Sequence, residues 1–410
     1  MLYLSGHRSV PPSLTYQQCV KETNIKRIFD FLRSGACESR AELVRAMELS
    51  ATSVSVLVEE LHERGFIAET GPKPTAQPGR RPIRLEFNAD ARHIAVFSLS
   101  MRGIAFTLLN LRCEVLEQIF VEFDSSRCTD ADAGDCYARK FEEILKTRSR
   151  RFDPARTMCV GICIPGVYLP DEHLFSMTTS IRVEFSETSM RTFEERIGIP
   201  VYIENSSVCL AYAEQKFLDA ANPGNPQARD LLYINIGDGV GASIIYKGDI
   251  VSGSYHTAGE IGHMTIDYRG KPCPCGNRGC LERYVNLNAI LDAVQARCAE
   301  CGLAQPQSFE EMVSGYRDVA EVDEVLRQIS ELLSFGVYNM ICATGILNIA
   351  LGGGIEALGE RFLMRLREYI RGRTFSLSNR MSLNYAGAGP DAESVGFAHY
   401  YLDKAFTITY

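Results

Sequence analysis

Residues 259–282 constrain this 410-residue chain more than any other stretch. They read GEIGHMTIDYRGKPCPCGNRGCLE, and four ligand-type side chains fall within eighteen residues of one another: His263, Cys273, Cys275 and Cys280. Zinc binds four such ligands tetrahedrally, and a complete shell of this kind leaves no position for a catalytic water. The pattern therefore predicts a structural Zn²⁺ site in a tight loop. The alternative is three cysteines packed as small apolar residues.

Two acids, Glu260 and Glu282, bracket the four ligands. Because the zinc shell is complete without them, we expect a loop pinned by metal to present both carboxylates to a bound ligand. The alternative is that they cap helices or pair with Arg278 and Arg283. The segment E-I-G-H followed by C-P-C-G-N-R-G-C-L-E resembles the ROK family, named for repressor, open reading frame and kinase. That family contains bacterial sugar kinases and sugar-responsive repressors.

Composition sets broad limits on the protein. With 46% apolar and 23% charged residues it is expected to be soluble, and its length suggests two or three domains. The net charge of -8 argues against a uniformly basic nucleic-acid binder, although residues 1–90 carry 12 basic and 11 acidic side chains. Fourteen cysteines without a signal peptide predict a reducing, cytoplasmic location. The most apolar stretch, 337–351, contains Asn339, Thr344 and Asn348, so no membrane span is predicted.

The first 88 residues have the pattern of a winged helix-turn-helix DNA-binding domain. After an arm without periodicity, apolar residues at helical spacing predict a helix over 24–32, and a capping box at 39–42 opens a second helix. A third helix starts after Ser50, three residues beyond the second. Two short strands, 66–68 and 83–87, then flank a Pro/Gly loop, which predicts the wing. The alternative is a small helical docking module.

Several polar side chains of this domain are candidates for contacts with double-stranded DNA. The outer face of the third helix offers small side chains that allow close approach to the major groove. Two adjacent arginines in the wing suit a narrow minor groove, where the negative potential is strongest. The pattern S-R-A-E-L, S-x-T-S-V-S and G-R-R-P resembles the winged helix of ROK repressors, which ROK kinases usually lack. The predicted DNA-binding residues are Arg40, Ser50, Thr52, Ser53, Ser55, Arg80 and Arg81.

Residues 89–410 alternate between strands and helices and are predicted to form an α/β domain. The resemblance is more specific: it implies a two-lobed, actin-like (ribonuclease-H-like) sugar-kinase fold that carries the zinc loop. Expected strands are 93–100, 103–110, 115–123, 158–164, 231–236, 241–246 and 346–351. Expected helices are 131–148, 286–299, 321–343 and 355–370.

Comparison with the motifs of ROK kinases predicts that phosphoryl transfer is lost. The segment Glu204-Asn205-Ser206 matches the E-N-D motif, so Ser206 stands where the resemblance places the catalytic base. A serine hydroxyl cannot take the substrate proton without a base of its own. Ser98 falls at the acid of the first phosphate motif, and Asp238 brings a negative charge into the second. We therefore expect no enzyme activity. The alternative is an active ATP-dependent sugar kinase with an added DNA-binding domain.

The sugar side of the motif set is retained. Asn205, Glu260, His263 and Glu282 match the positions that surround the sugar in the family, where carboxylates accept hydrogen bonds from hydroxyl groups. His263 would then serve both the metal and the ligand. Thr178 and Thr179 lie where a second sugar-contacting loop is expected.

These expectations combine into one prediction. The chain is expected to be a sugar-responsive transcriptional regulator that represses carbohydrate-metabolism genes, with a DNA operator and a small sugar or sugar phosphate as its ligands. Sugar binding would change lobe closure and so the spacing of two wings across a palindromic operator. A homodimer or tetramer is expected for that reason. The resemblance also allows a phosphotransferase-system protein as a partner.

Overall fold

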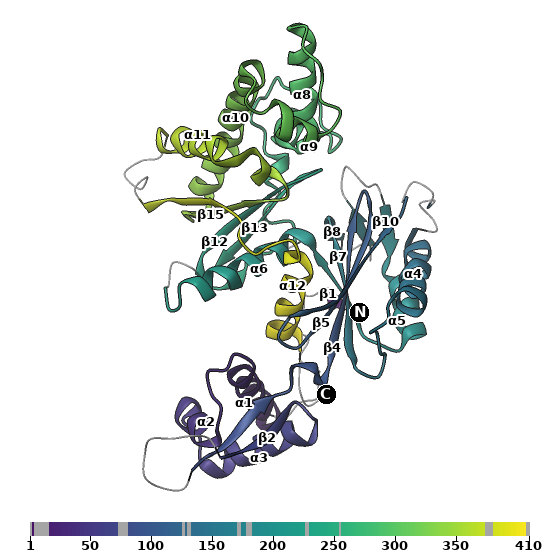
Figure 1. Cartoon of the computed structure of the whole chain (residues 1–410), viewed down its shortest axis with the longest axis vertical. Helices are drawn as coiled ribbons and strands as arrows, with labels where there is room; N and C mark the ends of the chain where they lie inside the picture. Colours follow the sequence, from purple (N-terminus) through teal and green to yellow (C-terminus); the bar gives the residue numbers. More distant parts are fainter. Residues whose placement is uncertain are drawn as a thin grey trace.

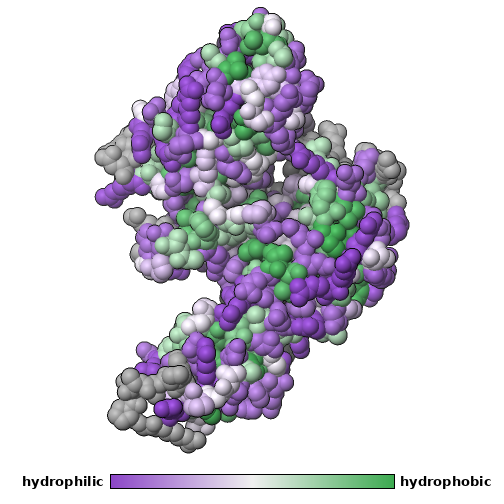
Figure 2. All heavy atoms as spheres, viewed as in Figure 1, coloured by the Kyte–Doolittle hydropathy of each residue, from purple (hydrophilic) through white to green (hydrophobic). Residues whose placement is uncertain are grey.

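The computed structural model describes residues 2–3, 16–72, 81–124, 128, 133–169, 174–177, 183–225, 229–253, 256–373 and 380–406. The chain forms three parts that follow one another along the long axis of the molecule (Figure 1). A small N-terminal unit lies at one end, and two α/β lobes form the rest. Figure 2 shows a largely hydrophilic face with a deep indentation between the N-terminal unit and the lobes.

The N-terminal unit consists of three helices and a two-stranded antiparallel sheet. Its elements are α1 (Tyr16–Arg33), α2 (Arg40–Met47), α3 (Ala51–Glu63), β2 (Ile67–Pro72) and β3 (Ile83–Phe87). Ser39 caps α2 by accepting a hydrogen bond from the Glu42 backbone N–H, and Ser50 caps α3 in the same way from Ser53. The helix α1 begins eight residues before the predicted position 24, so part of the expected arm is helical.

The first lobe is built on a six-stranded sheet in the order β1-β11-β7-β4-β5-β6. Three strands form an antiparallel meander, and β7, β11 and β1 then add in parallel beside the first of them. The strands are β4 (His93–Ser100), β5 (Gly103–Asn110), β6 (Val115–Glu122), β7 (Thr157–Ile164), β11 (Val201–Asn205) and β1 (Leu2–Tyr3). On one face lie α4 (Ala133–Glu143) and α5 (Glu187–Ile197).

The second lobe repeats this topology. Its sheet runs β14-β13-β12-β15-β16, again a meander followed by two parallel strands beside its first member. The strands are β12 (Leu231–Ile236), β13 (Val240–Tyr246), β14 (Asp249–Ile250), β15 (Asn348–Gly352) and β16 (Ser382–Tyr385). Its helices are α7 (Glu282–Val285), α8 (Leu287–Glu300), α9 (Phe309–Glu311), α10 (Ala320–Thr344) and α11 (Gly359–Arg371). None of the helices in the described part of the chain is both long and apolar enough to cross a membrane.

Two helices that the sequence did not predict lie between the lobes: α6 (Ser206–Ala221) and α12 (Ala392–Tyr400) (Figure 1). They pack closely, because a Cβ atom at Gly396 of α12 would lie 1.8 Å from the backbone oxygen of Cys209 in α6. The small sheet of β8 (Gly166–Leu169), β9 (Leu174–Met177) and β10 (Val183–Ser186) was not predicted either. The core of the N-terminal unit is continuous with that of the first lobe through residues of α12 and the turn after it.

Candidate metal centre and adjoining pocket

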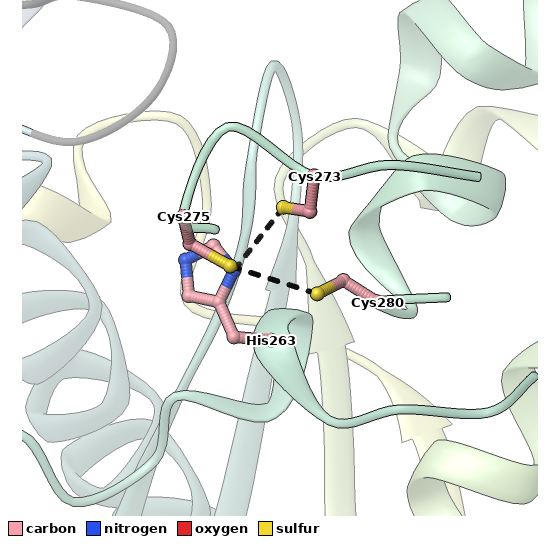
Figure 3. A group of neighbouring side chains, drawn as sticks. All are labelled: His263, Cys273, Cys275 and Cys280. Carbon is pink, nitrogen blue, oxygen red and sulfur yellow. Dashed lines mark hydrogen bonds between the residues drawn. The ribbon is translucent and has the colours of Figure 1, made fainter. Parts of the chain in front are cut away.

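The four predicted metal ligands converge in space (Figure 3). Their ligand atoms all lie within 4.8 Å of one another. The sulfurs of Cys275 and Cys280 are 3.7 Å apart, and the Cys273 sulfur is 3.8 Å from His263 Nδ1. In a tetrahedral site with Zn–S bonds of ~2.3 Å, ligand atoms are separated by about 3.7 Å. The donor set and its spacing therefore fit zinc.

The loop backbone explains how His263 meets the three cysteines, which follow it by ten or more residues. Gly279 has a φ of 67°, and a Cβ atom there would lie 1.7 Å from the backbone oxygen of Asp267, so only glycine fits. Backbone hydrogen bonds from Ile266 to Gly279 and from Leu281 to Met264 join the two arms of the loop at 2.8 and 2.9 Å. These contacts bring the histidine arm against the cysteine arm.

The electrostatics of the sulfur atoms also favour a cation. Cys280 is fully buried, and this burial together with the neighbouring Cys273 and Cys275 raises its thiol pKa to about 12. Three sulfurs this close cannot all be held as thiolates without a compensating positive charge. A divalent metal supplies that charge and stabilises the thiolates that bind it.

A pocket of about 110 Å³ adjoins the metal ligands and lies where both lobes meet. His263 belongs to both sites: its Nδ1 faces Cys273, whereas its Nε2 lies 3.8 Å from Glu260 Oε2. A metal on Nδ1 would fix the orientation of the ring and hence of Nε2. All four predicted sugar-binding residues line this one pocket: Asn205, Glu260, His263 and Glu282.

The two carboxylates differ in their surroundings. Glu282 is buried, and its Oε2 accepts a hydrogen bond from the Val240 backbone N–H at 2.9 Å. Glu260 is partly exposed; burial raises its pKa, a shift that His263 opposes and Glu282 increases. Two carboxyl groups that face the same pocket and repel each other are stabilised by hydroxyl donors, which a sugar supplies.

Asn205 is held rigidly at the opposite wall. It ends β11 and caps α6, because its Oδ1 accepts a hydrogen bond from the Ser207 backbone N–H at 2.7 Å. Its Nδ2 donates to the Gly166 carbonyl at 2.5 Å. Among the described residues nothing else bonds to this side chain, so one amide hydrogen and one lone pair are left for a ligand.

The pocket also contains polar side chains that we did not predict. Ser207, Ser243 and His256 line it together with the expected residues. His256 has a φ of 56°, a left-handed conformation that is unusual for a residue other than glycine. In the sequence, only its position four residues before Glu260 indicated that His256 could lie at the pocket. Thr178 and Thr179 lie outside the described residues.

Two of the positions compared with kinase motifs, Ser206 and Ser98, lie near one carboxylate. Ser206 begins α6 and lines the pocket, while Ser98 lies on β4. The Glu393 carboxylate of α12 is near enough for both hydroxyls to lower its pKa, although burial prevails and raises it. Neither hydroxyl has a hydrogen bond of ordinary length within the described part of the chain.

Two glycine-containing turns of the second lobe carry an acidic residue in or just after the turn. Asp238 occupies the turn between β12 and β13, and its backbone carbonyl accepts a hydrogen bond from Asn286 at 3.0 Å. The Gly354 backbone N–H donates to Glu356 Oε2 at 2.9 Å. The Glu356 carboxylate therefore already accepts a hydrogen bond from a backbone N–H of the loop 352–354.

On the N-terminal unit, the predicted DNA-facing side chains of α3 are exposed: Ser50, Thr52, Ser53 and Ser55. Val56 on the same helix is 60% exposed. Arg40 is less available, because it donates to Glu69 Oε1 at 2.7 Å and to the Ser55 carbonyl at 3.1 Å. Arg81 is exposed, whereas Arg80 lies outside the described residues.

Comparison with known proteins identifies the family. The profile described as "ROK family" matches residues 123–403. The chain is 27% identical to the xylose repressor of Bacillus subtilis (strain 168) over 396 residues, which covers 94% of this chain and 97% of that protein.

Solved structures show the same fold. A ROK family transcriptional regulator described as a homolog of the Escherichia coli MLC protein aligns with a TM-score of 0.76 at 23% identity, covering 93% of this chain and 97% of its own. A ROK family glucokinase from Streptomyces griseus, solved with glucose and AMPPNP, aligns with a TM-score of 0.61 at 20% identity over 75% of this chain and 98% of its own. The two α/β lobes thus have a sugar-kinase-like fold, and the chain belongs to the ROK family.

Proposed function

We propose that the chain is a sugar-responsive, DNA-binding transcriptional regulator that represses genes of carbohydrate metabolism. The observation that carries this proposal is a polar, sugar-type pocket with Ser206 at the base position, in a chain that also has a three-helix unit with an exposed helix face. A kinase would need a base at that position, whereas a sensor needs only to bind the sugar. The repressor name of the Bacillus subtilis relative supports this assignment.

In this proposal residues 1–88 form a winged helix-turn-helix domain and residues 89–410 form the sugar sensor. Zinc on His263 and the three cysteines is structural and holds the pocket loop. A sugar or sugar phosphate lies between the acids of that loop and Asn205, and its binding changes lobe closure. Two copies bind the two halves of an operator, so the active form is a homodimer or a tetramer.

We predict that the arginines of the wing contribute to DNA affinity through phosphates and the minor groove. For Arg80→Ala and Arg81→Ala, the slope of log affinity against log salt concentration should decrease by about 1 for each phosphate that is no longer neutralised. Arg148→Ala, an exposed arginine of the first lobe, is the matched control and should leave the slope unchanged. Salt titrations monitored by fluorescence anisotropy give these slopes. Unchanged affinity in both wing variants would contradict the assignment.

We also predict that Ser206→Asp alone will not produce a sugar kinase. Ser98 still lacks an acid, Asp238 still adds negative charge where phosphates would bind, and Glu356 still holds an N–H of the glycine loop. ADP release with D-glucose, D-xylose and N-acetyl-D-glucosamine should stay at background in wild type and variant. Turnover by wild-type protein that disappears in Asn205→Ala would favour the alternative, an ATP-dependent sugar kinase.

The proposed function is tested by selection of DNA. The purified protein is incubated with fragmented genomic DNA of its source organism, and the bound fragments are sequenced. We expect enrichment of palindromic sites upstream of genes for carbohydrate use, with less enrichment when the cognate sugar is present. Recovery of no sequence in preference to any other, with or without the sugars named above, would contradict it.

A further inference from the structure

Residues 401–406, which follow α12, contact both the N-terminal unit and α6, the helix that begins at the pocket. After α12 the chain continues through a single turn, Tyr401–Ala405, which carries Asp403. Asp403 Oδ1 accepts a hydrogen bond from Arg33 Nη2 of α1 at 2.8 Å. Its Oδ2 accepts from the Tyr212 hydroxyl at 2.8 Å and lies 2.6 Å from Lys216 Nζ, both on α6. The Asp403 carboxylate therefore contacts α1 of the N-terminal unit through one oxygen and α6 through the other.

This contact is shielded from water. The side chains of Asp403 and Arg33 are 17% and 13% exposed. Burial alone would raise the pKa of Asp403, but Lys216 and Arg33 outweigh this effect and hold the pKa below its usual value. A partly buried carboxylate with two cationic partners is much less screened by salt than a surface ion pair. It is therefore suited to transmitting a displacement of one partner to the other.

Aromatic packing surrounds the same junction. The Phe406 ring lies 5.3 Å from that of Phe29 in α1 and 6.2 Å from that of Phe66, next to β2. On its other side it lies 6.1 Å from Tyr401, which lies 5.2 Å from Tyr202 in β11. Because β11 ends at Asn205, which lines the pocket, these aromatic contacts also connect the pocket to the N-terminal unit.

The helix α6 connects the pocket to the carboxylate without a break. Its first residues, Ser206 and Ser207, line the pocket. Tyr212 and Lys216 follow Ser206 by six and ten residues, which is ~9 and ~15 Å along an α-helix. Within this stretch α12 packs closely against α6, where Gly396 meets the backbone of Cys209. A shift of α6 on ligand binding must therefore move Asp403 or break its contacts.

We propose that Asp403 is the positioning residue that couples occupancy of the pocket to the orientation of the N-terminal unit. This inference rests on the proposed function, because it needs both a sugar and DNA as ligands. Coupling between two sites requires an element whose state both ligands influence, and the segment α6–Asp403–α1 is that element. Asp403 touches neither ligand, so its replacement should change the communication between them and leave each binding site intact.

The test uses Asp403→Asn, Arg33→Met and the double variant in the full-length protein. The sugar is whichever of D-xylose, D-glucose and N-acetyl-D-glucosamine raises the Tm of the wild type, and the DNA is a duplex recovered by genomic selection. Calorimetry gives the sugar Kd, and fluorescence anisotropy gives the DNA Kd with and without sugar. We expect the sugar Kd to change less than about threefold, while the effect of sugar on DNA affinity falls from about tenfold or more to below threefold. The double variant should be no worse than either single variant.

Tyr212→Phe is a milder change at the same carboxylate, and Arg361→Met is the matched control. Tyr212→Phe removes one hydroxyl from the same carboxylate and should at least halve the effect of sugar, even where Arg33→Met fails to fold. Arg361→Met breaks a 2.8 Å ion pair with Asp323 in the second lobe and should leave the effect unchanged. A full sugar effect in Asp403→Asn and Tyr212→Phe, or loss of sugar binding itself in both, would overturn the inference and leave the proposed function standing. A wild-type protein that binds sugar and DNA with no mutual effect would contradict the proposed function and this inference with it.

Discussion

Cys280→Ala is expected to release the metal and to destabilise the second lobe strongly. The Cys280 sulfur is fully buried among the other ligands, so its removal opens the metal shell and leaves crowded thiols in its place. Binding of structural zinc contributes directly to folding, and removal of one ligand should lower the free energy of unfolding by at least ~4 kcal/mol, or Tm by about 10 °C. Zinc analysis of purified protein should fall from one equivalent to well below half. Cys275→Ala should have the same effect on zinc, although that side chain is exposed.

The matched control is Cys301→Ala, an exposed cysteine outside the zinc loop. Its zinc content and Tm should equal those of the wild type. Removal of metal from the wild type with a chelator should reproduce the instability of Cys280→Ala and should not destabilise that variant further. Wild-type protein with far less than one zinc, and with full stability after either cysteine is replaced, would show that the cysteines are only packed together.

The second large effect is expected at the pocket acids. A hydrogen bond from a sugar hydroxyl to a carboxylate contributes about 1.5 to 3 kcal/mol, so Glu260→Ala and Glu282→Ala should each weaken sugar binding tenfold or more. Calorimetric titration with the sugar that stabilises the wild type gives the two affinities. Zinc content and DNA binding without sugar should remain near wild type.

The structure refines this experiment for Glu282. Its carboxylate also accepts a hydrogen bond from the Val240 backbone, so alanine would leave a buried donor unpaired. Glu282→Gln keeps an acceptor for that N–H and is the variant that separates a ligand contact from a structural one. Glu300→Gln, in a surface helix away from the pocket, is the control. A normal sugar response in the Glu260 and Glu282 variants, or unfolding of both alanine variants, would assign the acids to the scaffold.

Much of the fold could be predicted because its strands and several helices have clear periodicity. The expected strands at 93–100, 103–110 and 231–236 agree with β4, β5 and β12 residue for residue. The metal site could be predicted because all four ligands lie in one short segment. Its geometry depends on local turns that glycine and proline set.

The helices α6 and α12 could not be predicted because neither has one apolar face. The buried residues of α12 lie on all sides of the helix, and α6 buries the polar Glu214 and Gln215 beside apolar side chains. The usual helical pattern of apolar and polar faces is absent in both. The pocket is also formed by residues far apart in sequence, so Asn205 could be placed beside Glu260 only through the family resemblance. The role of Asp403 depends on contacts 370 and 191 residues away, which no local pattern contains.

The coupling of sugar binding to DNA release is tested most directly by a DNA titration of the wild-type protein with and without sugar. A fluorescent duplex recovered by genomic selection is titrated with protein at fixed salt, first alone and then with a saturating concentration of the sugar that raises Tm. We predict that the sugar weakens DNA affinity by about tenfold or more, and that the duplex weakens sugar affinity by the same factor. Equal DNA affinity at every sugar concentration, for a sugar shown by calorimetry to occupy the pocket, would contradict a sugar-responsive regulator.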